Sequence, residues 1–259
     1  MTNSTPQASG RQASGAAPPE AEDFYAQCLV ELNRSGIPFL LGGTYAVAAY
    51  TGINRPTKDM DVFCRAGDYP RILNHFARAG YHTEVEDARW IAKVRRGPLF
   101  FDIIFNSTIA INPVTESWFA EAHDATICGI RTLLIPPTEL IWSKAFVQDR
   151  QKYDGADVAH LMLRTHRAVD WTRLLSLFEQ YWEVLLMHVV NFRFIYPTER
   201  ECVPRWLLDE LMDRLENHAN MPVPQVQVCR GRLFSRADYA IDVAEWGFAD
   251  VVGEGQRRP

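Results

Sequence analysis

A glycine pair followed by two acidic residues places the strongest constraint on how this chain folds. "LLGGTYAVAAY" is a short apolar run, then Gly42 and Gly43, then a segment of helical composition, which predicts a strand-to-helix junction. "KDMDVFC" follows and has the composition of a second buried strand. Because side chains alternate along a strand, we expect Asp59 and Asp61 to point to the same face.

A third acidic residue, Asp102, lies in the middle of the apolar run "LFFDIIF". A lone carboxylate there would carry a large desolvation cost, and the paired carboxylates of Asp59 and Asp61 would repel each other. A divalent cation relieves both problems, and oxygen ligands of this kind suit Mg²⁺. The three acids therefore predict a two-metal site for phosphoryl chemistry, with Mg²⁺ or Mn²⁺ as the cofactor.

The glycine pair supplies a second element of such a site. Without side chains, Gly42 and Gly43 let backbone N–H groups approach a triphosphate closely, and the start of a helix favours an anion. Thr44 can add a hydroxyl contact. These residues are predicted to bind the nucleotide.

The motifs "LLGGT", "KDMDVF" and "FFDIIF" resemble those of the nucleotidyltransferase superfamily, which includes DNA polymerase β, the antibiotic nucleotidyltransferases and minimal or toxin-type bacterial transferases. The family pattern is an apolar residue, Gly and then Gly or Ser, followed by Asp-apolar-Asp and a later third acid. The resemblance continues into "IPPTELIWSKAFVQDRQKYDGADVAHLM" and covers roughly residues 24–165. Many members have serine directly after the first glycine, where this chain has Gly43 and then Thr44.

The resemblance implies transfer of a nucleoside monophosphate from an NTP, such as ATP, to an acceptor hydroxyl. Asp59 and Asp61 would hold both metal ions, and Asp102 would bind the catalytic metal and help to deprotonate the acceptor. Lys144, in the helical segment, would contact the nucleotide. Lys144 has an alternative interpretation as a lysine that covers apolar helix surface.

The order of apolar runs predicts an α+β nucleotidyltransferase fold, with a mixed sheet flanked by helices and a mainly helical C-terminal region. The hairpin expected at "RGP" makes the sheet mixed. We expect a disordered leader over 1–22, the nucleotidyltransferase core over 23–135 and the helical region over 136–259. A helix capped by Asp68 is expected within the core.

The composition limits which kinds of partner the protein can bind. The net charge of −5 argues against a surface that is basic throughout, so any RNA would meet a local cluster of charge. One candidate is the basic and aromatic stretch "CRGRLFSRADY", which can equally be a segment packed on helices. The leader has no apolar stretch typical of an export signal, and the five scattered cysteines suit reduced thiols, so we expect a cytoplasmic protein without membrane contact.

The acceptor is left open by the sequence: a small molecule, a protein or RNA would each suit the chemistry. A toxin-type transferase that modifies tRNA or other RNA ends is one alternative, and it would require an antitoxin partner. A nucleotide-binding module without catalysis is the other, and the intact set of three acids disfavours it.

Overall fold

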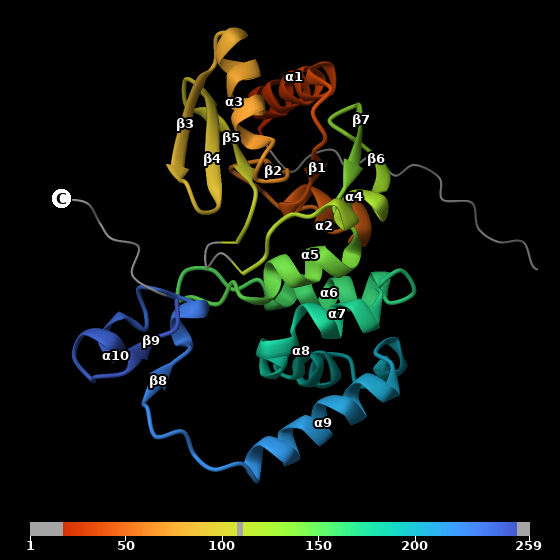
Figure 1. The fold of residues 1–259 in the computed structure, drawn as a ribbon. Coiled ribbons are helices and arrows are strands. Elements are labelled where there is room, and N and C mark those ends of the chain that lie inside the picture. Colours follow the sequence, from red (N-terminus) through yellow and green to blue (C-terminus); the bar gives the residue numbers. More distant parts are fainter. Residues whose placement is uncertain (1–17, 108–110, 253–259) are drawn as a thin grey trace, which may run out of the picture. The chain divides into compact units, whose positions relative to one another are not determined.

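The computed structural model describes residues 18–107 and 111–252, and the chain divides into two compact units, Met1–Pro136 and Pro137–Pro259 (Figure 1). The first unit is built around a seven-stranded sheet, and the second is mainly helical. Among the described residues, no helix combines the length and the apolar character needed to cross a membrane.

The first unit alternates helices and strands in its N-terminal half and ends in a three-stranded meander, a short helix and a hairpin. Its helices are α1 (Pro19–Ser35), α2 (Gly43–Thr51), α3 (Tyr69–Arg78) and α4 (Glu116–Ala120). Its strands are β1 (Leu40–Leu41), β2 (Asp61–Phe63), β3 (His82–Asp87), β4 (Ile91–Arg96), β5 (Leu99–Ile104), β6 (His123–Ile127) and β7 (Ile130–Leu134).

The strand order β3-β4-β5-β2-β1-β7-β6 confirms the predicted mixed sheet. The pairs β2–β5 and β1–β7 are parallel, whereas β1–β2, β3–β4, β4–β5 and β6–β7 are antiparallel. The expected hairpin is β4–β5, and its turn passes through Gly97 with a φ of +60°, which glycine adopts without strain. The two central strands β2 and β1 are short, so the residues that flank them are placed by loops as well as by the ladder.

Helices α1 and α3 contact each other and pack on the sheet (Figure 1). The apolar side of α1 buries Phe24, Leu29 and Leu32, and the opposing side of α3 buries Ile72 and Phe76. This packing places α1 against β5 and β7, the strands that flank β2 and β1.

Helix α1 begins at Pro19, so the expected disordered leader over 1–22 is wrong for its last residues. Proline at the first helical position has a φ suited to the helix, and Glu20 and Glu22 in the first turn interact favourably with the helix dipole. Ala21 is buried, which adds packing to the first turn. The part of the expected leader over 1–17 lies outside the described residues.

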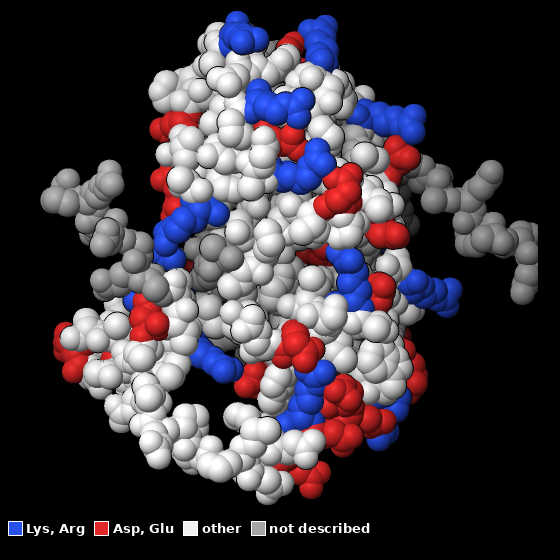
Figure 2. Space-filling model, in the orientation of Figure 1, with Lys and Arg blue, Asp and Glu red and all other residues white. Residues whose placement is uncertain are grey.

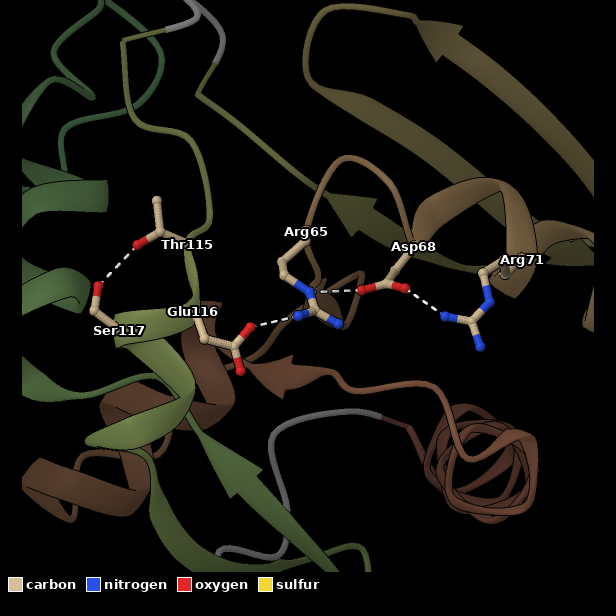
Figure 3. A network of polar contacts seen from close by, with 6 residues as sticks. All are labelled: Arg65, Asp68, Arg71, Thr115, Glu116 and Ser117. Carbon is tan, nitrogen blue, oxygen red and sulfur yellow. Dashed lines mark hydrogen bonds and ion pairs between the residues drawn. The ribbon is translucent and has the colours of Figure 1, made fainter.

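Asp68 precedes α3 as expected, but its side chain makes no capping hydrogen bond to the helix backbone. Its two carboxylate oxygens instead accept hydrogen bonds from Arg65 (2.8 Å) and Arg71 (2.7 Å), as Figure 3 shows. Arg65 also pairs with Glu116 at the start of α4. The carboxylate therefore links two guanidinium groups, which are stronger partners than backbone N–H groups.

The second unit consists of five longer helices followed by a small C-terminal portion. The helices are α5 (Pro137–Ala145), α6 (Gly155–Thr165), α7 (Trp171–Leu177), α8 (Trp182–Ile195) and α9 (Arg205–Ala219). The C-terminal portion contains the parallel strands β8 (Val228–Cys229) and β9 (Ala249–Asp250), with helix α10 (Ala240–Ala244) between them. This two-stranded sheet was not expected from the sequence.

Charged side chains of both signs lie interspersed on the face seen in Figure 2. This pattern agrees with the small net charge, and no extended basic surface covers the described residues on that face. All five cysteines are free, and three of them, Cys28, Cys64 and Cys229, are buried. They contribute to packing, as expected.

Candidate functional site

The second and third acids of the sequence motif lie side by side in the sheet. Strands β2 and β5 pair in parallel with Asp61 directly opposite Asp102. Backbone hydrogen bonds fix this register, because the N–H of Asp102 donates to the carbonyl oxygen of Met60 at 2.9 Å. Directly opposed residues of neighbouring strands project to the same face, so these two carboxylates share one face of the sheet.

Asp59 lies just before β2, whereas the sequence predicted it within the strand. The Thr57 hydroxyl donates to the carbonyl oxygen of Asp59 at 3.0 Å and to its Oδ1 at 3.2 Å. These bonds hold Thr57 and Asp59 together around the bend at Lys58, and the regular strand begins at Asp61. Burial still alternates from Asp59 to Val62, because Met60 and Val62 are buried while Asp59 and Asp61 are half-buried, as the sequence predicted.

The glycine motif and the acidic motif meet at Gly43. This residue begins α2 with a φ of +55°, a conformation that glycine adopts without strain. A Cβ atom here would lie 1.7 Å from Oδ2 of Asp61. The missing side chain therefore lets the Asp61 carboxylate lie against the first turn of a helix, where the helix dipole favours negative charge.

Gly42 lies between β1 and α2, and its contact with the nucleotide stays a prediction. Its N–H donates to the carbonyl oxygen of Asp61 at 2.9 Å, so this group is already used within the sheet. A Cβ at Gly42 would approach the side chains of Ile135 and Phe63 to 2.5 Å. Gly42 thus allows close packing between β1 and its neighbours. Thr44 is half-buried in the first turn of α2.

Tyr25 of α1 is a neighbour of the site that the sequence reasoning missed. It is buried, and its hydroxyl donates to the carbonyl oxygen of Lys58 at 3.1 Å, next to Asp59 in the chain. Burial and then the negative charges of Asp59, Asp102 and Asp61 raise the pKa of Tyr25. All three carboxylates therefore act on one buried hydroxyl, which places them around a common region.

Asp102 is buried and has a basic neighbour on β4. Lys93 lies directly opposite it in the β4–β5 hairpin, and the Lys93 Nζ is 3.2 Å from Asp102 Oδ1. Burial raises the pKa of the Asp102 carboxyl, the charge of Lys93 opposes this rise, and Asp59 adds to it. Apart from this ion pair, Oδ1 has no hydrogen-bond partner among the described residues.

The candidate site offers carboxylate oxygens as ligands for a divalent cation. Carboxylate oxygens are the ligands that Mg²⁺ and Mn²⁺ prefer, and the buried, unbonded Oδ1 of Asp102 is suited to such a bond. Among the described residues, however, no group of three or more His, Cys, Asp or Glu side chains is gathered closely enough to hold an ion. The carboxylates of Asp61 and Asp102 fit a cation in their chemistry and in their strand register, while Asp102 is paired with Lys93.

Lys144 lies in the second unit and is held by two carboxylates. Its Nζ is 2.9 Å from Asp154 Oδ2 and 2.8 Å from Asp157 Oδ2, and all three side chains are buried. Burial favours the neutral amine, but the two carboxylates outweigh it and raise the pKa of Lys144. The ammonium therefore joins α5 to α6, and the nucleotide contact of Lys144 stays a prediction.

The basic and aromatic stretch near the C-terminus also forms internal contacts. Arg232 pairs with Asp250, and Arg230 lies 3.4 Å from Glu183 of α8. The ring of Phe234 is 6.2 Å from that of Phe146. These contacts agree with the packed alternative for this stretch.

Comparisons with known proteins give matches among solved structures alone, because no protein-family model and no curated protein matches this chain. One similar structure is that of the antibiotic-resistance factor ANT(2'')-Ia, at 13% identity and TM-score 0.46, covering 66% of this chain and 98% of that one. Another is the lincosamide antibiotic adenylyltransferase LnuA, at 17% identity and TM-score 0.39, covering 57% of this chain and 98% of that one. A third is an antigenic nucleotidyltransferase-like protein from Paracoccidioides brasiliensis, at 14% identity and TM-score 0.42, covering 71% of this chain and 91% of that one.

These structural neighbours are nucleotidyltransferases or nucleotidyltransferase-like proteins. Their identities lie between 13% and 17% and their TM-scores do not exceed 0.46, so their substrates and mechanisms are not transferred to this chain. The functional assignment must come from the side chains described above.

Proposed function

We propose that this protein is a metal-dependent nucleotidyltransferase that moves a nucleoside monophosphate from an NTP to an acceptor hydroxyl. The observation that carries the proposal is the contact between the two motifs. Gly43 opens α2 with no side chain, and the carboxylate of Asp61 occupies the space that a Cβ would need. Asp102 lies directly beside Asp61 in the sheet.

The residues of the first unit divide into three proposed roles. Asp59, Asp61 and Asp102 would hold Mg²⁺ or Mn²⁺, which when bound would neutralise triphosphate charge and make the acceptor hydroxyl more acidic. The first turn of α2, with Gly43 and Thr44, would bind phosphate oxygens through N–H groups that have no partner within the helix. Gly42 would support this turn through close packing.

The proposed reaction is an in-line displacement at the α-phosphorus of the NTP. The acceptor oxygen forms a bond to this phosphorus, the bond to the bridging oxygen of the β-phosphate breaks, and pyrophosphate leaves. The proton of the acceptor hydroxyl would pass to Asp102, the buried carboxylate that lies directly opposite Asp61 in the sheet. Tyr25, through its bond to the Lys58 carbonyl, would fix the segment that carries Asp59.

The experiment is a transfer assay with each labelled NTP, Mg²⁺ and a cell extract that supplies small-molecule, protein and RNA acceptors. We expect label to enter one of these fractions and pyrophosphate to appear in step with it. Asp61→Asn should abolish both signals, while Asp124→Asn, which removes an exposed carboxylate of β6, should retain them. Equal transfer by the wild type and Asp61→Asn would refute the proposal.

The same assay separates the alternative functions. Label in tRNA or other RNA ends would identify the toxin-type activity, for which an antitoxin partner remains a prediction. Nucleotide binding without metal-dependent release of pyrophosphate would indicate a module without catalysis.

A further inference from the structure

Lys93 belongs to a row of charged residues that crosses four strands of the sheet. Cross-strand pairing places Glu84 of β3 opposite Lys93 of β4, Lys93 opposite Asp102 of β5, and Asp102 opposite Asp61 of β2. Directly opposed residues share a face, so this row continues the candidate site onto the β3–β4 hairpin. Lys93 is the one cation in the row.

The ammonium of Lys93 contacts two carboxylates that differ in exposure. Its Nζ is 2.8 Å from Glu86 Oε2 and 3.2 Å from Asp102 Oδ1. The side chain of Glu86 is 49% exposed, whereas that of Asp102 is 10% exposed. Lys93 itself is 13% exposed, and its Nζ also lies over the ring of Phe100, 4.8 Å from the ring centroid. The ammonium can therefore stay bound to Glu86 if its contact with Asp102 is lost.

Asp102 cannot serve Lys93 and a divalent cation equally well. Both cations are attracted by the same carboxylate, and two positive charges a few ångströms apart repel each other. Of the two Lys93 contacts, the one to Asp102 is the longer, at 3.2 Å against 2.8 Å to Glu86. Exchange of this contact for a metal ion thus leaves the shorter ion pair with Glu86 intact.

We propose that Lys93 is a positioning residue that competes with the metal ion for Asp102 and moves fully to Glu86 when the metal binds. This inference rests on the proposed function, because it assumes that the carboxylates hold Mg²⁺ or Mn²⁺. Lys93 stabilises the buried carboxylate in the absence of metal, and it sets the metal affinity of the site below that of the carboxylates alone.

The test measures Mn²⁺ binding to the full chain by isothermal titration calorimetry. Lys93→Met should lower the Kd for Mn²⁺ at least about fivefold, the factor given by one unit charge at about 4 Å in water. Lys93→Arg, which keeps the charge, should bind Mn²⁺ much as the wild type does. Without metal, Lys93→Met should melt at a lower temperature than the wild type, and it should gain more on addition of Mn²⁺.

Arg95→Met is the matched control. Arg95 lies two residues along β4 and has the same charge, but it pairs with Glu84 at 2.7 Å. If Lys93 acts through direct contact with Asp102, Arg95→Met should change the Kd far less than Lys93→Met. Equal changes in the two variants would show a general field effect and would overturn the inference, while metal binding by the wild type would leave the proposed function standing.

A second pair of variants decides the question if Lys93→Met does not fold. Glu86→Gln removes the alternative partner, so Lys93 should hold Asp102 more strongly and the Kd for Mn²⁺ should rise. Glu84→Gln removes the same charge from the same strand and should have a smaller effect. Equal effects of these two variants overturn the inference; absence of Mn²⁺ binding in the wild type and in every variant overturns both the inference and the proposed function.

Discussion

Each unit of the molecule contains a lysine held between two carboxylates, and the two arrangements differ in what surrounds them. Lys144, with Asp154 and Asp157, is buried in the second unit, and both of its contacts are shorter than 3 Å. Lys93 contacts a half-exposed glutamate, and its contact with Asp102 is longer and leaves a carboxylate oxygen without a hydrogen bond. In the first arrangement, Lys144 and both carboxylates are buried and paired with one another. In the second, Lys93 can give up its contact with Asp102 and keep the one with Glu86.

The difference separates a structural ion pair from a candidate binding site. A buried pair whose partners are all satisfied resists the loss of any member, because the remaining charge cannot reach water. A carboxylate with an unbonded oxygen, beside two further acids, has a reason to bind a cation. Substitution of an acid in the first unit is therefore expected to affect activity, whereas substitution of Lys144 in the second unit is expected to affect stability.

The largest expected effect is on activity, in the first unit. Asp59→Asn or Asp61→Asn should lower nucleotide transfer by at least about a hundredfold, a typical loss when one group that stabilises the transition state is removed. The melting temperature should stay the same or rise, because repulsion between the carboxylates is relieved. Turnover and thermal melting of the same preparations check both parts, and near wild-type turnover would end the assignment of these acids.

The largest expected effect on stability is in the second unit. Lys144→Met should lower the free energy of unfolding by about 3–5 kcal/mol, since the buried carboxylates of Asp154 and Asp157 would lose the buried ammonium that they share. Lys152→Met is the control, because Lys152 is 67% exposed and lies 4.0 Å from Asp154; its change should stay within about 0.5 kcal/mol. Urea denaturation measures both. Similar values for the two variants would remove the distinction between the two lysines.

A titration of ATP and adenosine tests the nucleotide contact predicted for Lys144. Lys144→Arg retains the charge and suits this comparison better than a neutral variant. If the ammonium serves only α5 and α6, affinity for both ligands should be unchanged. A selective loss of ATP affinity would support the contact.

The contact between Gly43 and Asp61 predicts an intermediate effect. Gly43→Ala should destabilise the protein by roughly 2 kcal/mol or more, because alanine disfavours a positive φ and its Cβ would displace the carboxylate. Gly129→Ala isolates the backbone part, since Gly129 also has a positive φ but no atom lies within 4 Å of its Cβ position. Denaturant unfolding compares the two, and a cost for Gly43→Ala no greater than that for Gly129→Ala would contradict the steric argument.

The smallest expected effect is a pH dependence in the second unit. His188 is buried, and burial lowers its pKa below the ordinary 6.5, although its bond to the Ala145 carbonyl oxygen opposes this. The unfolded chain then binds a proton more readily than the folded chain. Stability should be full above pH 6.5 and fall as the pH drops below this value. His188→Gln should flatten the curve of unfolding free energy against pH below pH 6.5. An unchanged slope in this variant would show that other groups cause the pH dependence.

Much of the first unit could be predicted from the sequence, because its cues are local. Apolar runs with the glycine turn indicated the β4–β5 hairpin, and the mid-strand acid Asp102 was correctly placed in β5. The tight turn also fixes the register, so counting back from Gly97 would have placed Lys93 opposite Asp102. The start of α1 could likewise have been found from Pro19 and the acidic residues that follow it.

The rest depends on contacts that local patterns do not specify. Asp59 lies before the strand and accepts a bond from Thr57, a local contact that the alternation of side chains does not specify. Asp68 takes two arginines in place of a helix cap. Lys144 meets Asp154 and Asp157 across a loop between two helices, so its burial follows from their packing.

Direct binding of Mn²⁺ tests most sharply whether the acids of the first unit, and not those around Lys144, form the metal site. Calorimetric titration should compare the wild type with Asp61→Asn and Asp154→Asn, which remove one carboxylate charge from each region. We expect the wild type and Asp154→Asn to bind Mn²⁺ with similar affinity and Asp61→Asn to lose binding. Undiminished binding by Asp61→Asn, or no binding by the folded wild type, would contradict the assignment of this site.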